Sequence, residues 1–316
     1  MKEDVLVRPL KEDELDDADT IMRTAFGTYL GLPEPLKFMG DADFVKTRFA
    51  ANPSAAIAAE VNGKIIGSNF LLDWGSVGVF GPLTVHPTYW DKGIANRLMQ
   101  ETMKIFAGWG TTHVGLFTFA QSGKHVHLYQ KFGFWPRFLT AVMSKPVVEK
   151  GSGVKSARYS AMGAAEQRET LEDCHALTNK LHSGLDLRKE IVSVYHQKLG
   201  DTILLKGNGN LLEAFAICHV GPNTEAGSGN CYVKFAAAIP SQDSAAHFDS
   251  LLDACEQYAH SNKAQRITAG ANAGRQKQYK RMMERGFGTE MLGVAMQNPN
   301  EPGYNTEDAW IIDDWR

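Results

Sequence analysis

The chain of 316 residues is 43% hydrophobic and 22% charged, with a formal net charge of −3, a balance typical of a soluble globular protein. This balance argues against nucleic acid as the main partner, because phosphate binding needs a concentrated basic surface. The distribution of apolar residues also argues against a membrane protein, because no apolar run approaches the roughly eighteen residues of a membrane span.

The cysteines and the first residues of the chain bear on its compartment. The four cysteines lie in the second half, without a Cys-x-x-Cys pair, which argues against a zinc site or a disulfide framework. The acidic N-terminal stretch lacks the apolar core of a signal peptide. We therefore expect a cytoplasmic protein.

Short strands and helices alternate along residues 5–146, as judged from hydrophobic periodicity. In chain order we expect a strand at 5–10, helices at 14–26 and 41–50, strands at 55–61, 64–74 and 77–85, a helix at 93–106, a strand at 113–119, a helix at 122–131 and a closing pair of strands within 136–146. The hairpin signal Asn62-Gly63 joins the first two of the three successive strands. This order predicts an α/β (α+β) fold with a mixed, mostly antiparallel twisted sheet flanked by helices.

The second half of the chain repeats the pattern of the first. A Gly-Phe pair that begins at Gly133 recurs at Gly286, 153 residues later, and in each copy the tenth residue after this glycine is a methionine. A constant offset over a whole half predicts two tandem copies of one domain. We expect an N-terminal domain at 1–148, a Gly/Ser-rich linker at 149–157, a C-terminal domain at 158–297, and a tail at 298–316 whose apolar run Ala-Trp-Ile-Ile is suited to adding a strand.

One helix of the first copy begins on unusually small side chains. The stretch WDKGIANRLM, residues 90–99, puts Gly93 and Ala95 at the start of a predicted helix. A helix start carries unpaired N–H groups and the positive end of the helix dipole, so small side chains there let a pyrophosphate reach the main chain. The alternative interpretation is a tight loop in which glycine supplies an unusual backbone angle.

This stretch resembles motif A of the GNAT superfamily, the acetyl-CoA-dependent N-acyltransferases. That motif ends a strand with an apolar-His-Pro corner and continues as Gln/Arg-x-x-Gly-x-Gly/Ala into a helix. The corner here is Val85-His86-Pro87, and the loop that follows runs from Trp90 to Ala95. Trp90 stands where the family usually has Gln or Arg, which leaves the side-chain role at that position open.

A second segment, residues 122–134, resembles the family pattern Asn-x-x-Ala-x-x-Leu-Tyr-x-x-x-Gly-Phe. Tyr129 stands at the tyrosine of the pattern, while Ser122 replaces Asn and His125 replaces Ala. The two motifs follow each other in the family's order, and the resemblance covers residues 5–146.

The resemblance implies an acyl-CoA site. The pantetheine arm of acetyl-CoA, or of another acyl-CoA, would lie where the strand ending at Val85 splays from the strand 113–119, and would pair with main-chain groups of the first. The resemblance implies no metal. It assigns acyl-CoA binding to Leu83, Thr84, Val85, Trp90, Asp91, Lys92, Gly93, Ile94, Ala95, Asn96, Ser122, His125 and Tyr129.

The implied chemistry is direct transfer of an acyl group from a thioester to an amine. A phenol with a pKa of about 10 is protonated at neutral pH, so Tyr129 is the candidate general acid for the departing thiolate. The backbone N–H of Val85 is the candidate donor to the thioester carbonyl. The general base stays open, because strand 77–85 contains no carboxylate. The candidates are Asp73, His86 and His125, and the alternatives are bulk water or an amine that arrives already neutral.

The second copy has lost both motifs. Ala246 stands where the loop glycine is expected, and Met282 stands where the tyrosine is expected, with Tyr279 one turn earlier. We therefore expect this copy to bind no cofactor and to shape or cap the acceptor cleft of the first domain.

The sequence thus predicts an N-acetyltransferase acting on a primary amine of a small-molecule acceptor. Its partners would be acyl-CoA and that amine, without nucleic acid or membrane, and the protein would be a monomer or a homodimer. The alternative is a CoA-binding pseudoenzyme that serves as a sensor or scaffold, which the missing strand carboxylate favours and the retained Tyr129 disfavours.

Overall fold

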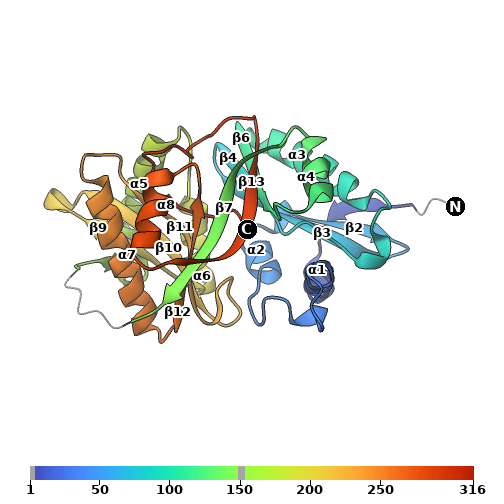
Figure 1. The fold of residues 1–316 in the computed structure, drawn as a ribbon, viewed down its shortest axis with the longest axis horizontal. Coiled ribbons are helices and arrows are strands. Elements are labelled where there is room, and N and C mark those ends of the chain that lie inside the picture. The colour runs from blue at the N-terminus through green and yellow to red at the C-terminus, as the bar shows by residue number, and fades with distance from the viewer. Residues whose placement is uncertain (1–3, 149–153) are drawn as a thin grey trace.

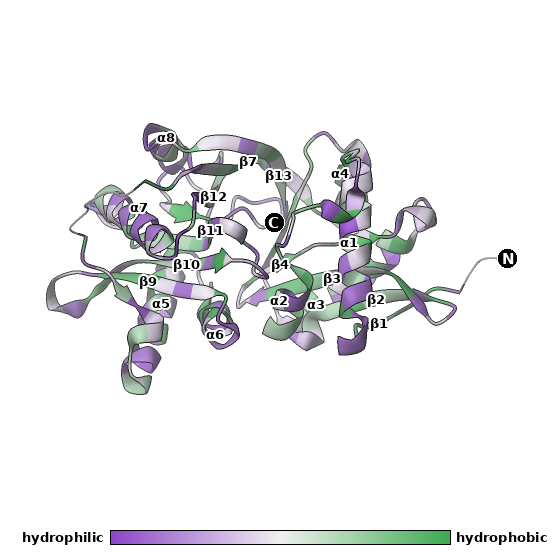
Figure 2. Cartoon of the chain, turned by 90° about the horizontal axis from the view of Figure 1, so that it is seen from below, coloured by the Kyte–Doolittle hydropathy of each residue, from purple (hydrophilic) through white to green (hydrophobic). Residues whose placement is uncertain are grey.

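The computed structural model describes residues 4–148 and 154–316. Within these ranges a continuous sheet of 14 strands spans the molecule, with helices packed on it (Figure 1). Among the helices of these ranges, none combines the length and the apolar character needed to cross a membrane. Hydrophobic residues concentrate in the strands, whereas helix α8 on the outside is mostly hydrophilic (Figure 2).

The first half contains the elements that build the site. They are β1 (Leu6–Pro9), α1 (Leu15–Tyr29), α2 (Val45–Ala51), β2 (Ala56–Val61), β3 (Lys64–Trp74), β4 (Val77–Phe80), β5 (Thr84–Val85), α3 (Ile94–Trp109), β6 (His113–Thr118), α4 (Gly123–Gln130) and β7 (Trp135–Pro146). Two expectations are corrected. The strand expected at 77–85 is broken at Gly81-Pro82, after which β5 turns toward β3, and the strand pair expected within 136–146 is the single long strand β7.

The second half repeats this order of elements. They are β8 (Ala157–Arg158), α5 (Ala164–Leu181), α6 (Arg188–Gln197), β9 (Gly200–Lys206), β10 (Leu212–Gly221), β11 (Gly227–Ala238), α7 (Ser244–Ser261), β12 (Arg266–Asn272), α8 (Gln276–Glu284), β13 (Gly288–Asn298) and β14 (Ile311–Ile312). Of the linker expected at 149–157, residues 149–153 lie outside the described residues, and Ala157 already begins β8.

Alternating side chains of β2 attach helices to opposite faces of the sheet. Ala56 and Ala58 pack with the apolar residues of α1 and α2, whereas Ile57 and Ala59 pack with α3. Successive side chains of a strand point to opposite faces, so a strand that is apolar at nearly every position is buried on both. The sheet of the first half is therefore the middle layer between α1 and α2 on one face and α3 on the other.

The two halves exchange their last strands. The strand order is β1-β2-β3-β4-β6-β13-β7-β12-β11-β10-β9-β8, so β13 lies beside β6 and β7 lies beside β12 (Figure 1). The repeated methionines follow the exchange: Met143 of β7 is buried in the core of the second half, and Met296 of β13 in the core of the first. Each half thus supplies a central strand to the other, and the two copies share one continuous sheet.

Candidate active site

Two parallel strands separate in the first half and leave a gap. β4 and β6 pair only as far as Val79 and Gly115. Beyond this point β5 pairs with β3 instead, through Gly67 opposite Val85 and Ser68 opposite Thr84. The gap between β5 and the end of β6 is the splay that the family resemblance implies.

The backbone of Val85 faces this gap. The N–H of His86 donates to Ile66 O at 2.8 Å. In an antiparallel pair, hydrogen-bonded and non-hydrogen-bonded residues alternate, so the backbone groups of Val85, opposite Gly67, point away from β3. The indole N–H of Trp90 donates to Val85 O at 2.7 Å. Trp90 therefore ties the loop to the strand, a side-chain role that the family pattern does not indicate. The N–H of Val85, which does not bond to β3, points into the gap.

The N-terminus of α3 forms one end of the gap. Gly93 has a φ of 78°, in the left-handed region that favours glycine, and a Cβ placed on it would meet no atom within 4 Å. The first N–H groups of α3 are thus open to an anion. Lys124 adds positive charge beside them: its ammonium lies 2.6 Å from the Asp91 carboxylate and 6.0 Å from the centre of the Trp90 ring.

A cavity of about 670 Å³ fills the gap and extends beyond it to α1. Of the thirteen residues assigned to acyl-CoA, all but Lys92 line it. The ammonium of Lys92 lies 4.6 Å from the centre of the Tyr89 ring, which does line the cavity. The hydroxyl of Thr84 is buried and has no hydrogen-bond partner within the described ranges. An open helix start, an inward-facing strand N–H and an unsatisfied hydroxyl fit a long ligand that ends in phosphates.

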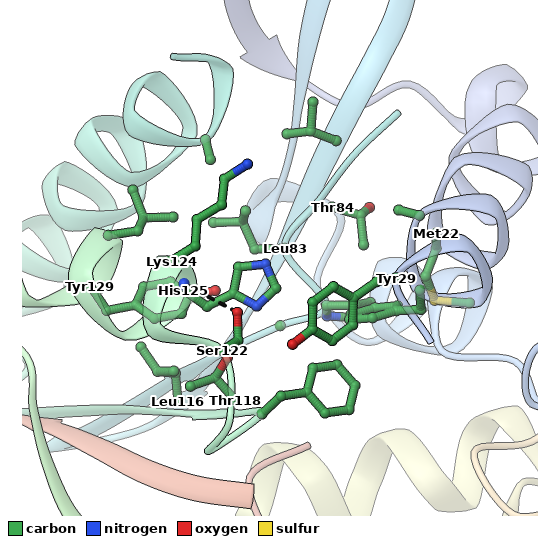
Figure 3. Close-up of a pocket in the computed structure, with 18 of the residues that line it drawn as sticks. Met22, Tyr29, Leu83, Thr84, Leu116, Thr118, Ser122, Lys124, His125 and Tyr129 are labelled. Carbon is green, nitrogen blue, oxygen red and sulfur yellow. Dashed lines mark hydrogen bonds between the residues drawn. The ribbon is translucent and has the colours of Figure 1, made fainter. Parts of the chain in front are cut away.

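Tyr129 and His125 lie one turn apart on α4 and both line the cavity. Figure 3 shows Tyr129 on one side of the cavity and Tyr29 of α1 on the other, with His125 and Ser122 between them. The Tyr129 ring packs on Phe80 at 5.8 Å between centroids, and its burial raises the pKa of the phenol. Burial, helped by Lys124, lowers the pKa of the His125 imidazole, so at neutral pH this ring is uncharged.

Ser122 is the N-cap of α4, and its hydroxyl accepts a hydrogen bond from the His125 N–H at 3.4 Å. The two other candidate bases have structural partners. Asp73 forms an ion pair with Lys189 and accepts from the Gly75 N–H. His86 lies within 2.8 Å of the Thr88 hydroxyl. Neither Asp73 nor His86 lines the cavity, so His125 is the candidate that faces it.

Several cavity residues could not be expected from the motifs. Phe26 and Tyr29 come from α1, Met291 from β13, and Trp315 and Arg316 from the tail. Trp315 packs so closely on β6 that a Cβ at Gly115 would lie 2.2 Å from its ring. The motifs give no sign of these residues, because exchange of the last strands and docking of the tail bring them to the cavity.

Arg48 of α2 ties three segments together beneath the cavity. Its guanidinium donates to Gly81 O at 2.6 Å, to the Glu225 carboxylate at 2.9 and 3.1 Å, and to Arg316 O. The side chains of Arg48 and Glu225 are almost fully buried. Burial by itself raises the pKa of Glu225, but Arg48 and Lys234 outweigh this and hold the pKa below its usual range. The pair fixes the second half against the break between β4 and β5.

A model of the acetyltransferase (GNAT) family matches residues 21–134. The matched segment contains the splayed strands, the open helix start and Tyr129. Residues 21–134 belong to the GNAT family. The resemblance noted in the two sequence motifs is thus confirmed, and this GNAT segment supports acyl transfer as the class of reaction. No curated protein sequence matches the chain.

Solved structures of similar fold extend the likeness to the whole chain. A proposed acetyltransferase of Pyrococcus horikoshii is 13% identical with a TM-score of 0.69, over 98% of this chain and 95% of that one. A tandem GNAT protein from the clavulanic acid biosynthesis pathway is 11% identical with a TM-score of 0.56, over 93% and 98%. A GCN5-related N-acetyltransferase of Sphaerobacter thermophilus is 12% identical with a TM-score of 0.58, over 93% and 95%. These likenesses show the fold, and the expected tandem of two GNAT-like halves is confirmed.

Proposed function

We propose that the chain is an N-acetyltransferase that moves an acetyl group from acetyl-CoA directly to a primary amine of a small-molecule acceptor. The observation that carries the proposal is the inward-facing N–H of Val85, which lies between an open helix start and Tyr129 along one continuous cavity. A site that only bound phosphates would not need a main-chain donor and a phenol in the same gap.

In this proposal the pyrophosphate of acetyl-CoA binds at the start of α3. Main-chain N–H groups at Gly93–Asn96 would donate to it, and Lys92 and Lys124 would supply charge. The pantetheine arm would follow Leu83, Thr84 and Val85, with the Thr84 hydroxyl finding in it the partner that it lacks. This placement directs the thioester toward Tyr129.

The residues of this chain then act on two atoms of the thioester. The Val85 N–H stabilises the negative charge that grows on the carbonyl oxygen. The amine nitrogen bonds to the carbonyl carbon and loses a proton to water, the carbon–sulfur bond breaks, and the Tyr129 phenol gives its proton to the departing thiolate. Solvent restores the phenol. The apolar surroundings raise the pKa of the Tyr129 phenol, which keeps it protonated at neutral pH, and they raise the pKa of a thiol in the same direction.

The second half takes part in this proposal as a wall of the acceptor site, through Met291, Trp315 and Arg316. We place the reaction in the reducing cytoplasm, in keeping with four cysteines that are free and buried. Tyr129 and the backbone supply the chemistry, so the proposed reaction needs no metal.

Two measurements on the purified protein test the proposal. Calorimetry should show binding of acetyl-CoA, and a free-thiol assay should show release of CoA that rises when a primary amine is added and does not rise with the matched tertiary amine. Tight binding without release, with every amine of a broad panel, would instead establish the CoA-binding pseudoenzyme. Absence of acetyl-CoA binding would contradict both.

A further inference from the structure

The end of the cavity away from the helix start is walled by aromatic rings. We call this end the aromatic chamber and define it by Phe26, Tyr29, Phe38 and Phe119. The rings form a continuous series: Phe38 to Phe26 at 5.2 Å, Phe26 to Phe119 at 6.0 Å, and Phe119 to Tyr29 at 5.1 Å between centroids. The series then reaches His125, whose ring lies 5.1 Å from Tyr29.

The chamber adjoins the reacting end of the site. His125 and Tyr129 are four residues apart on α4 and therefore lie on one face of that helix. Figure 3 shows Tyr29 reaching toward them from α1 across the cavity. A ring held against Phe26, Phe119 and Tyr29 would carry an amine on a short arm to the side of the cavity where Tyr129 lies.

The remaining wall is soft and apolar. Met22, Met39 and Met291 contribute thioethers, and Trp315 contributes an indole. Thioether sulfur makes favourable contacts with aromatic rings and adapts its shape to them. Such a wall suits a flat apolar body and offers few partners to the hydroxyl groups of a sugar.

The charges of the lining side chains disfavour a strongly cationic ligand. Among the cavity-lining residues of the described ranges, the single carboxylate side chain is Asp91, which lies at the helix start and is paired with Lys124. Arg316 also lines the cavity, but its guanidinium is paired with Asp314 at 3.2 Å and lies 4.1 Å from the centre of the Tyr232 ring. An ammonium in the chamber would thus be desolvated, with no unpaired carboxylate side chain among the lining residues of the described ranges to compensate it.

We propose that the acceptor is a small primary amine built on an aromatic ring, without a second positive charge, and that it enters the aromatic chamber as the neutral amine. The inference rests on the proposed N-acetyltransferase function and specifies the substrate of that same site. It also accounts for the absence of a carboxylate on strands β4 and β5: an amine that arrives neutral needs no strong base.

A panel of acceptors tests the ring. With saturating acetyl-CoA, kcat/KM for 2-phenylethylamine should exceed that for 2-cyclohexylethylamine by roughly three- to tenfold, because ring–ring contact adds to burial of the same area. Spermidine and glucosamine should be slower still, since one is a polycation and the other a polar ring. Faster transfer to spermidine, to glucosamine or to the cyclohexyl amine would overturn the proposal.

The variant Phe26→Leu removes one ring from the chamber. It should raise KM for 2-phenylethylamine by roughly tenfold, reduce the preference over the cyclohexyl amine, and leave the Kd of acetyl-CoA unchanged. Leu36→Ala is the matched control, because Leu36 lies on the adjoining segment, is 57% exposed and does not line the cavity. An unchanged ring preference in a folded Phe26→Leu protein would contradict the assignment.

A pair of amines of equal shape tests neutral uptake. The pH profile of kcat/KM for 2-phenylethylamine should break at the pKa of the free amine, and for its less basic β,β-difluoro analogue the break should move to lower pH by the difference between the two amine pKa values. If a protein group such as His125 took the proton, both profiles would break at one shared pH, and neutral uptake would be wrong.

These tests separate the two levels of the argument. Failure to bind acetyl-CoA, or binding without thiol release for any amine, refutes the proposed function and the inference together. Binding with release that favours amines lacking an aromatic ring refutes the inference alone and leaves the acetyltransferase intact.

Discussion

The two halves of the chain place the same pair of diverging strands in different surroundings. In the first half, β4 and β6 separate after Val79 and Gly115, and the gap is part of the open cavity. In the second half, β11 and β12 separate after Val233 and Ala269, and the tail strand β14 fills the gap by pairing Ile312 with Ala236. One splay opens into a cavity and the other is closed by the chain itself.

The fit of the tail in the second splay is close. A Cβ on Gly270 of β12 would lie 2.4 Å from the Asp314 side chain. Asp313 accepts from the buried Arg275 at 2.7 Å, and Asp314 accepts from the Tyr232 hydroxyl at 2.9 Å. An extended segment thus pairs with β11 much as an acyl-CoA arm is proposed to pair with Leu83 and Val85. The comparison teaches that an unused splay must be filled, because two separated strands leave backbone groups unpaired.

The helix starts differ in the same sense. α3 begins behind Gly93 with open space in front of it, whereas at the start of α7 the Ser244 hydroxyl accepts from the Ser241 N–H at 2.8 Å and Asp243 adds a carboxylate. Met282 of α8, expected at the place of Tyr129, is fully buried. The second half therefore offers neither an open helix start nor a tyrosine at this place.

The largest expected effect is on turnover, when the proposed general acid of the first half is removed. Tyr129→Phe should lower kcat by at least about a hundredfold while the Kd of acetyl-CoA stays nearly the same, because the ring still packs and only the proton donor is lost. The control is Tyr279→Phe on the corresponding helix of the second half, which should leave turnover unchanged. Steady-state kinetics, calorimetry and Tm on both variants decide the role, and near-normal turnover in a folded Tyr129→Phe protein would mean that another group is the acid.

The next effect concerns the strand that fills the second splay. Ile312 is fully buried, so Ile312→Ala should lower the free energy of unfolding by about 2–5 kcal/mol, through lost burial and the cavity left behind. Leu211→Ala, at a side chain that is 72% exposed, should change it by less than about 0.5 kcal/mol. Urea unfolding measures both, and equal stability of the two variants would show that β14 does not close the splay.

At the junction between the halves, we expect the titration of His219 to lower the free energy of unfolding by about 3 kcal/mol at acid pH. His219 is buried beside Lys234, Arg48, Glu225 and Glu190, and burial, followed by the charge of Lys234, lowers the pKa of its imidazole to about 4. Between this value and the unfolded pKa of about 6.5, the unfolded chain binds a proton that the folded chain does not, so stability falls as the pH falls through this window. Above it the contribution of His219 is constant.

The variant His219→Gln isolates this contribution, because glutamine cannot titrate. Unfolding free energies measured from pH 7 down to pH 4 should fall more steeply for the wild type than for the variant. Other buried histidines, such as His113 and His125, titrate in both proteins and cancel in the difference. Parallel curves would show that His219 is not held neutral at the junction.

The smallest effect concerns the open helix start. Gly93→Glu should weaken acetyl-CoA binding by about tenfold or more, since it puts bulk and negative charge against the pyrophosphate, where a charge-assisted contact is worth about 1.5–3 kcal/mol. Gly93→Ala separates the backbone strain at a positive φ from the charge, and Ala246→Glu tests the corresponding helix of the second half.

Titration should also give one acetyl-CoA per chain. Unchanged affinity in a folded Gly93→Glu protein, or two sites per chain, would remove the contrast between the halves.

The sequence could predict the parts of the site that are local in the chain. The expected helix at 93–106 corresponds to α3, the helix at 122–131 to α4, and the strands at 55–61 and 64–74 to β2 and β3. Hydrophobic periodicity and glycine placement depend on neighbours within a few residues, so they are readable along the chain. For the same reason the two motifs were enough to predict that Gly93 and Tyr129 line one cavity, as they do.

Tertiary structure alone decided how the two copies are joined and which residues form the walls of the aromatic chamber. The hydrophobic pattern of β7 would be the same whether it paired in its own half or with β12, because side-chain alternation does not specify the partner strand. Trp315 reaches Gly115 because the tail continues past β14, which pairs in the other splay. The ring series from Phe38 to His125 joins residues of α1 and α4 with Phe38 and with Phe119, which directly follows β6. The sequence by itself determined a tandem of GNAT-like folds and one predicted acyl-CoA site, since both are written in short motifs. The shape of the aromatic chamber depends instead on contacts between residues far apart in the chain, such as Phe26 and Phe119.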